Sequence, residues 1–194
     1  MTYKEIRDKL AGKSVGIAGC GGLGSNCAVA LARVGMGKLI LADFDRVEPD
    51  NLNRQYFFTD QVGEFKAEAL RDNIHRIDEK VSIEAHIINL DPDSIKTLFA
   101  DCDVIVEAFD LNEAKLMIIE TVLADMPDKY IISGQGVAGY GNNEGIRTER
   151  LGRLIIVGDM ETEVSDEQPA LGPRVGAIAN LQANLVLEIL LNTD

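Results

Sequence analysis

Basic residues and cysteines are scarce in this sequence. There are 19 Lys and Arg against 32 Asp and Glu, which gives a formal net charge of -13. This balance argues against a nucleic-acid partner or an anionic membrane surface, because either would need clustered Lys and Arg. The three cysteines, Cys20, Cys27 and Cys102, form no CxxC pair and are odd in number. We therefore expect no disulfide framework and no zinc, and we interpret the cysteines as reduced structural thiols.

Long apolar runs are also missing. No uninterrupted stretch approaches the roughly 18 residues of a membrane span, and the amino-terminal MTYKEIRDKLAGKS lacks the apolar core of a signal peptide. We expect a cytoplasmic protein with no membrane partner. The 194 residues, 46% of them hydrophobic, fit one domain over residues 1–194. Such a chain should bury roughly 70% of its unfolded surface.

Apolar residues alternate between strand-like and helix-like spacing along the chain. Short apolar runs predict strands over residues 14–19, 38–43, 81–88, 103–109, 130–134 and 153–159. Helical spacing predicts helices near residues 3–10, 23–34, 64–77, 92–99, 112–125 and 173–191. Residues 134–145 and 160–172 are typical of loops. Because strands alternate with helices, we predict an α/β, Rossmann-like, doubly wound and mostly parallel sheet with helices on both faces.

A glycine-rich turn lies between the first predicted strand and the next helix. The segment GIAGCGGLGSN contains GxGxxG as Gly19, Gly21 and Gly24. Such glycines permit a tight turn and a close approach of the backbone to a phosphate, while the helix amino terminus offers free N–H groups. The motif alone is a weak signal, and a tight turn without a ligand is the alternative.

An acidic residue ends the second predicted strand. Asp43 follows Gly24 by 19 residues, the position from which a carboxylate accepts hydrogen bonds from ribose hydroxyls. Asp45 is a second candidate for nucleotide binding, and a simple turn acid is about equally consistent with its position.

Polar residues are concentrated in the run Asn51-Leu52-Asn53-Arg54-Gln55 just beyond this strand. Arg54 and the later Lys66 can neutralise a triphosphate, and the amides of Asn51, Asn53 and Gln55 can donate hydrogen bonds to it. A dehydrogenase has no evident use for this cluster, so the run favours ATP over a redox dinucleotide. For each single residue the alternative is a solvated loop position, and for Lys66 an exposed helix position.

A further carboxylate, Asp110, follows the fourth predicted strand and should lie at the same sheet edge as Asp43. It could hold Mg²⁺ against the phosphates. The alternative is an amino-terminal cap for the helix that starts near Asn112.

Five motifs in this order resemble a known family: GCGGLGS, LADFDxVxxxNLNRQ, the helix residue Lys66, Asp110 and PRVGxxxxLQAN. The chain is similar to the ThiF, MoeB and HesA group of adenylyltransferases, relatives of the ubiquitin-activating enzymes. Its short length and PRVG ending resemble the compact ThiF-type branch, which is associated with thiamine synthesis.

This resemblance implies an activity and a set of roles. The activity is adenylation of the carboxy-terminal glycine of a ThiS-like, ubiquitin-like sulfur carrier with ATP and Mg²⁺, with release of pyrophosphate, by a homodimer. The implied roles are phosphate binding by Gly22 and its neighbours, ribose binding by Asp43, triphosphate binding by residues 50–54 with Gln55 and Lys66, and Mg²⁺ binding by Asp110. Arg54, Lys66 and Asp110 would thus be the catalytic residues, because fixed cations must stabilise the charge that accumulates at the α-phosphate.

The chain departs from these relatives in several places. It lacks the two CxxC pairs that many carry, and residues 159–170 contain no cysteine for a thioester or persulfide step. Leu111, Asn112 and Lys115 follow Asp110 where relatives have Asn and, further on, Arg. Arg7 is the candidate for the arginine that relatives receive from a partner subunit. Two other functions stay open: a non-catalytic nucleotide- or carrier-binding module, and an NAD-dependent oxidoreductase.

Overall fold

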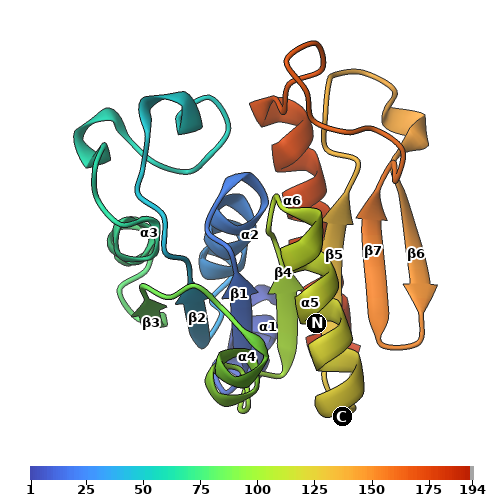
Figure 1. The fold of residues 1–194 in the computed structure, drawn as a ribbon. Helices are drawn as coiled ribbons and strands as arrows, with labels where there is room; N and C mark the ends of the chain where they lie inside the picture. The colour runs from blue at the N-terminus through green and yellow to red at the C-terminus, as the bar shows by residue number, and fades with distance from the viewer. Residues whose placement is uncertain (193–194) are drawn as a thin grey trace.

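A seven-stranded sheet forms the centre of the protein, whose computed structural model describes residues 1–192 (Figure 1). The strand order is β3-β2-β1-β4-β5-β7-β6, and only β6 runs antiparallel to its neighbour. The strands are β1 Ser14–Ala18, β2 Lys38–Ala42, β3 Ser82–His86, β4 Val104–Glu107, β5 Tyr130–Gln135, β6 Arg147–Leu151 and β7 Leu154–Gly158. The predicted doubly wound, mostly parallel sheet is therefore confirmed.

Six α-helices connect and cover these strands. They are α1 Tyr3–Leu10, α2 Gly22–Arg33, α3 Lys66–His75, α4 Pro92–Leu98, α5 Asn112–Asp125 and α6 Gly172–Asn192, with short 3-10 helices at Pro49–Asn51, Thr59–Gln61 and Asn143–Gly145. Local sequence explains several starts. Thr2 and Glu5 form a capping box at α1, and Asp91 accepts a hydrogen bond from the Ser94 amide at α4.

Strand alternation divides the interior into two cores, one on each face of the sheet. In β4, Val104 and Val106 belong to the core shared with α1, α2, α3 and α6, whereas Ile105 packs with residues of α4 and α5. Figure 1 shows α4 and α5 in front of the sheet and α2 and α6 behind it. Helices on both faces are thus confirmed as well.

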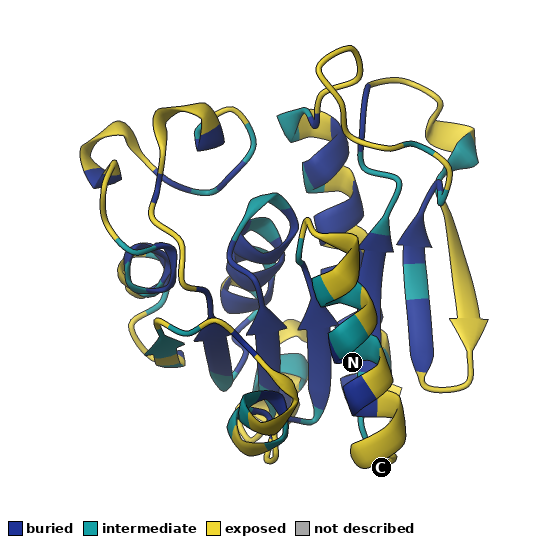
Figure 2. Cartoon of the chain, viewed as in Figure 1, coloured by how far each residue is buried: buried dark blue, intermediate teal, exposed yellow. Residues whose placement is uncertain are grey.

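One strand was not predicted. β6 has no buried residue, because it forms the outer edge of the sheet and pairs with β7 alone (Figure 2). Its sequence, RTERL, carries charges on both faces and lacks an apolar run. The sequence pattern could not distinguish such an edge strand from a loop.

Helix α6 has the length and composition of a membrane-spanning helix, although 44% of its most apolar window is buried inside the fold. A core helix meets the same criterion. α6 packs against α2 and the sheet, and its buried Gln182 donates hydrogen bonds to the backbone of β4 and β5. We interpret its apolar character as core packing.

The loops that follow β2, β4, β5 and β7 all lie at the end of the sheet where the parallel strands finish, the upper end in Figure 1. Ligands bind at this edge in open α/β sheets. The glycine turn that follows β1 lies at this edge too, and the candidate residues from the sequence lie in this turn, in the loops after β2 and β4, and at the start of α3.

Candidate functional site

The glycine-rich turn after β1 is packed too tightly for side chains at two of its positions. A Cβ atom at Gly24 would lie 1.8 Å from the carbonyl oxygen of Gly19, and Gly19 itself has φ +93°. At Gly21, by contrast, the nearest atom to an added Cβ is Nε2 of Gln55 at 3.7 Å. Gly19 and Gly24 therefore serve packing, whereas Gly21 leaves the backbone open on one side.

Helix α2 starts at Gly22, directly behind this open side. The first amides of a helix have no acceptor within the helix, so they favour an anion bound at the helix start. The geometry matches the phosphate-binding turn that the motif predicts.

Asp43 is buried and stabilises the glycine turn through a hydrogen bond to its backbone. Its Oδ2 accepts a hydrogen bond from the Cys20 amide at 2.6 Å, and its Oδ1 accepts one from the Asp45 amide at 2.7 Å. Burial raises the pKa of Asp43 above its ordinary value, and the two backbone donors partly oppose that rise. Each carboxylate oxygen keeps a free lone pair for a further donor.

Lys66 is the first residue of α3 and is only 7% exposed, so the alternative of an exposed helix position is wrong. Its Nζ lies 2.8 Å from Oδ2 of Asp45. Asp45 therefore holds the lysine at the carboxyl edge of the sheet and is more than a turn acid. Its carboxylate is itself about half exposed, at 48%.

The loop that carries Arg54 is tied to the first turns of α2. Asn26 donates from Nδ2 to the carbonyl oxygens of both Gly22 and Arg54, at 2.7 and 2.9 Å. Ser25 donates to the Gly21 carbonyl at 2.6 Å and accepts from the Tyr56 amide at 3.0 Å. Sequence reasoning missed Ser25 and Asn26, although both directly follow the glycine motif.

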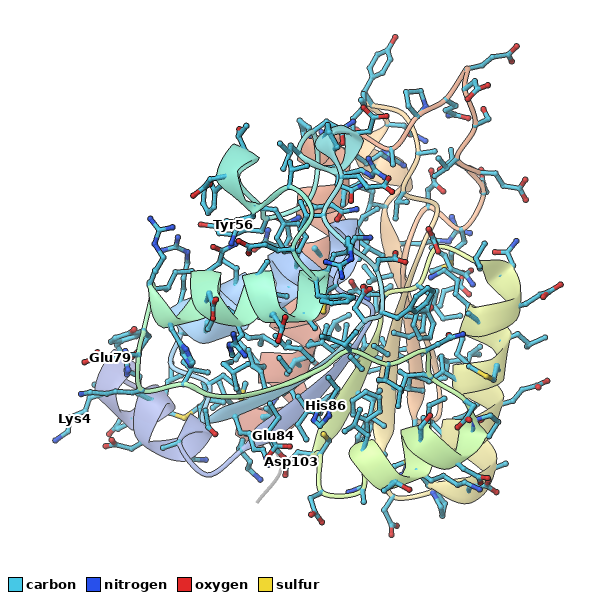
Figure 3. The ribbon with its side chains drawn as sticks, turned by 60° about the vertical axis from the view of Figure 1, so that its left-hand side comes forward. Lys4, Tyr56, Glu79, Glu84, His86 and Asp103 are labelled. Carbon is cyan, nitrogen blue, oxygen red and sulfur yellow. The ribbon has the colours of Figure 1, made fainter. Side chains whose placement is uncertain are left out.

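These tethers place Arg54 over the glycine turn. A Cβ at Gly22 would lie 3.6 Å from Cγ of Arg54. The guanidinium donates from Nη1 to Oδ1 of Asn53 at 2.8 Å and to the Asp50 carbonyl at 3.0 Å. At the far end of the loop, Nδ2 of Asn73 in α3 donates to the backbone carbonyl of Tyr56 at 3.0 Å. Tyr56 is labelled in Figure 3.

The three amide residues of the run differ in their surroundings. Asn51 and Gln55 are buried, so a solvated loop position is wrong for both, whereas Asn53 is exposed. Oδ1 of Asn51 accepts from the Glu48 amide at 3.1 Å, which shapes the 3-10 turn. Oε1 of Gln55 is buried without a hydrogen-bond partner among the described residues. Gln55, whose Nε2 faces Gly21, is the amide best placed for a ligand on the turn.

Asp110 follows β4, the strand beside β1, and is exposed. The cap of α5 is Leu111, so the capping alternative for Asp110 is wrong. Within residues 1–192 no side chain pairs with Asp110, and no group of three or more His, Cys, Asp or Glu is arranged to hold a metal. Mg²⁺ is commonly held by one or two carboxylates together with substrate phosphates, so a single free carboxylate at this edge fits the ion.

A buried ion pair borders the site from α6. Nη2 of Arg174, in the PRVG motif, lies 2.5 Å from Oδ2 of Asp159, and its Nη1 donates to the Gly141 carbonyl at 2.7 Å. The pair joins three segments: the loop after β5, the end of β7 and the start of α6. No sequence signal indicated Asp159 as the partner of Arg174.

Two other expectations can be compared with the structure. All three cysteines are free and buried, and burial raises the pKa of Cys27 and Cys102 to about 12, which confirms their interpretation as structural thiols. Arg7 lies 2.6 Å from Asp78 of its own chain, and its role toward a partner subunit stays a prediction.

The fold and the glycine turn define a Rossmann-like α/β domain of the class that binds phosphate-bearing ligands at its carboxyl edge. More specifically, the chain belongs to the ThiF family, whose model matches residues 2–194. The family resemblance inferred from the motifs is thereby confirmed.

Curated relatives match part of the chain. Ubiquitin-like modifier-activating enzyme 5 of Drosophila ananassae is 38% identical over 128 residues, 60% of this chain and 31% of that protein. The protein of the same name from Caenorhabditis briggsae is 44% identical over 88 residues, 45% of this chain and 19% of that protein. These matches span less than a third of the relatives' own length.

Solved structures share the fold over nearly the whole chain. TcdA, the tRNA N6-threonylcarbamoyladenosine dehydratase of E. coli, was solved with ATP and has a TM-score of 0.87 at 20% identity, over 97% of this chain and 89% of that one. E. coli MccB, solved with MccA, has a TM-score of 0.73 at 24% identity, over 95% and 58%. Both similarities support the α/β assignment.

Proposed function

We propose that the chain binds ATP at the carboxyl edge of its sheet and adenylates the carboxy-terminal glycine of a small ubiquitin-like carrier protein, with release of pyrophosphate. One observation carries this proposal: Asn26 binds the carbonyl oxygens of Gly22 and Arg54 together, so an arginine is fixed over the phosphate-binding turn. The ATP complex of TcdA, which has the same fold, supports ATP as the ligand.

In this proposal the glycine turn binds the phosphates and Asp43 binds the ribose. The turn comprises Gly19, Gly21, Gly22 and Gly24. Asn51, Asn53 and Gln55 belong to the same loop as Arg54. Nε2 of Gln55 faces Gly21 and donates to no acceptor among the described residues, so it can donate to a phosphate oxygen on the turn. Arg54 supplies a planar fork of donors for phosphate oxygens.

Lys66 and Asp110 complete the proposed site. Lys66 is held by one half-exposed carboxylate, Asp45, so the incoming phosphate chain can compete for its ammonium group. Asp110 would hold Mg²⁺, which supplies positive charge against the phosphates when bound. The attacking group is the carrier's carboxylate, so the step needs no nucleophile from this chain.

We infer a ThiS-like sulfur carrier and a role in thiamine biosynthesis from the resemblance of the PRVG motif to the ThiF-type branch. The relatives named as activating enzymes for ubiquitin-like modifiers support a carrier of this protein class. A tRNA substrate, as in the name of TcdA, is disfavoured by the net charge of -13. The single domain, the cytoplasmic location and the homodimer remain predictions.

The test is carrier-dependent exchange of radiolabelled pyrophosphate into ATP, measured with small purified carriers that end in Gly-Gly. Exchange that is absent, or that does not depend on the carrier, contradicts the proposal. Replacement of Arg54 by Ala should slow exchange by about a hundredfold, because the guanidinium stabilises charge in the transition state. An unchanged rate removes Arg54 from the site.

The same experiment separates the alternatives. A non-catalytic module would bind the carrier tightly without exchange. An NAD-dependent oxidoreductase would bind NAD in preference to ATP when both are compared by calorimetry. The tethered Arg54 favours ATP in that comparison.

A further inference from the structure

A carboxylate lies completely buried at the end of β4. Glu107 has no exposed surface, and both of its side-chain oxygens are used. Oε1 accepts from the Phe109 amide at 2.7 Å, and Oε2 accepts from the Ser133 hydroxyl at 2.6 Å. Ser133 is the partner of Glu107 in the register between β4 and β5. The side chain is thus bound by two strands and by the loop that follows its own strand.

Lys115 compensates the charge of this carboxylate. Its Nζ lies 3.0 and 2.9 Å from the two oxygens of Glu107 and donates to the Gly134 carbonyl at 3.0 Å. Lys115 is in the first turns of α5, and its side chain is only 13% exposed. All three ammonium donors therefore have acceptors in the protein, and the lysine has none left for a ligand.

A buried ion pair of this kind is a poor way to gain stability. Removing two charges from water is costly, and well-packed apolar residues of similar volume often stabilise a fold as well or better. An apolar pair could not, however, accept the hydrogen bond from the Phe109 amide. This bond is the contribution that distinguishes the pair from ordinary core packing.

The Phe109 amide belongs to the loop that carries Asp110. The same loop is in contact with the glycine turn, because a Cβ at Gly19 would lie 2.8 Å from the Ala108 carbonyl oxygen and 3.3 Å from the Phe109 ring. The loop is thus held by Glu107 on one side and by the turn on the other. Within residues 1–192, the side chain of Asp110, the next residue, forms no hydrogen bond or ion pair that would fix it.

We propose that Glu107 and Lys115 are positioning residues, which hold the backbone at Phe109 so that the Asp110 carboxylate meets metal-bound ATP at the glycine turn. This inference rests on the proposed function for the role of Asp110. In this inference Glu107 acts as the hydrogen-bond acceptor for the Phe109 amide, and Lys115 neutralises the buried carboxylate.

The test uses two double variants that differ in one property. E107M/K115M removes both charges, keeps similar volumes and deletes the acceptor for the Phe109 amide. E107Q/K115M also removes both charges but keeps an amide oxygen at the acceptor position. K96M is the matched control, because Lys96 also forms ion pairs, with Asp93 and Asp125, away from the site.

Two measurements are made on each folded protein: hydrogen exchange of the Phe109 amide by NMR, and the Mg²⁺ concentration that half-maximally strengthens ATP binding in calorimetry. For E107M/K115M we expect roughly tenfold faster exchange and a roughly tenfold higher Mg²⁺ midpoint, with ATP binding in EDTA unchanged. E107Q/K115M should recover most of both effects. K96M should match the wild type.

A purely structural pair gives a different result. In that case E107M/K115M, in which neither charge is left unpaired, shows the wild-type Mg²⁺ midpoint and the wild-type exchange rate of the Phe109 amide. This result overturns the inference. If E107M/K115M does not fold, E107V/K115M takes its place, because it also removes both charges and the acceptor and carries a residue that suits a strand: a midpoint raised by about threefold or more supports positioning, and an unchanged midpoint overturns it. Failure of the proposed function is seen separately, as wild-type protein without carrier-dependent pyrophosphate exchange, and both measurements still apply then.

Discussion

Two lysine–carboxylate pairs lie at the same sheet edge and differ in their access to solvent. We call the partly exposed pair open and the buried, fully hydrogen-bonded pair closed. Lys66 pairs at 2.8 Å with Asp45, whose side chain is 48% exposed, and Lys115 pairs at 2.9 Å with Glu107, whose side chain is fully buried. Lys66 is bound by one replaceable partner, whereas Lys115 is saturated by three acceptors. The difference indicates that a ligand can recruit the first lysine, while the second holds the protein together.

The same contrast extends to the two halves of the site. The half between Gly19 and Lys66 is tethered by Ser25 and Asn26, which bind backbone carbonyls and leave the charged groups open. The half that follows β4 and β7 is joined by buried ion pairs, such as Arg174 with Asp159, in which Nη1 and Nη2 of the arginine have protein acceptors and its buried Nε has none among the described residues. We therefore expect substitutions in the first half to lower mainly the rate of adenylation, and substitutions in the second half to lower mainly the stability of the fold.

The largest expected effect is on stability, at the closed pair. Lys115→Met leaves the Glu107 carboxylate buried without a cation, which should lower the free energy of unfolding by about 3–5 kcal/mol. Urea unfolding followed by circular dichroism measures it. A loss below about 1 kcal/mol would mean that the pair is no more closed than the one at Lys66.

The open pair should respond in the opposite way. Lys66→Met is expected to slow carrier-dependent pyrophosphate exchange by about a hundredfold, because a cation is lost where charge accumulates, and to cost only about 1 kcal/mol of stability. Lys4→Met, an exposed position on α1 far from the site, is the control (Figure 3). If Lys66→Met lost stability instead of rate, the contrast between the two lysines would be wrong.

A smaller effect is expected from the tether itself. Asn26→Ala removes both hydrogen bonds that hold the Arg54 loop to the glycine turn, which should cost about 1–2 kcal/mol of stability. Exchange should slow by about tenfold, since Arg54 loses its fixed position. Asn180→Ala is a fair control, because Asn180 also donates to a helix carbonyl, that of Gly176, on an exposed part of α6. Equal rates for the two variants would show that the tether does not matter for catalysis.

The open half could be predicted from the sequence because its signals are local. Gly19 and Gly24 lie within one strand–helix–strand unit, and Asp43 and Arg54 lie in the loop that follows its second strand, where chain direction alone brings the strand ends to one edge. In the closed half Asp110 could be predicted for the same reason, but the ion pairs could not. Asp159 and Arg174 are joined only by the folding of a loop that carries no periodic pattern. The burial of Glu107 depends on Ser133 from a neighbouring strand.

Exposure was the other quantity that sequence reasoning could not supply. Lys66 and Gln55 are buried although each is polar, because tertiary contacts rather than local spacing cover them. Strand β6 was missed for the converse reason, since an edge strand without buried residues shows no apolar alternation. The motifs thus predicted which groups carry the proposed chemistry, but not which of them are free to act.

The smallest predicted effect is a pH-dependent loss of stability at the ion pair between Asp159 and Arg174. Burial alone would raise the pKa of Asp159, but the amides of Thr162 and Glu161, the Thr162 hydroxyl and Arg174 outweigh it and keep this pKa below its ordinary value of 3.8. A carboxyl group whose pKa is lowered on folding contributes stability above its unfolded pKa and loses it as the pH falls through the folded pKa. Thr162→Ala deletes the hydroxyl donor and should cost on the order of 1 kcal/mol at pH 7. That cost should persist while Asp159 is ionised and shrink only as the pH falls through its folded pKa, which lies below 3.8, because the protonated carboxyl no longer gains from the donor. Urea unfolding at pH 7 and at several pH values down through this acidic range checks this, and a cost that shrank already well above pH 3.8 would show that Asp159 is not held as an anion by this cluster.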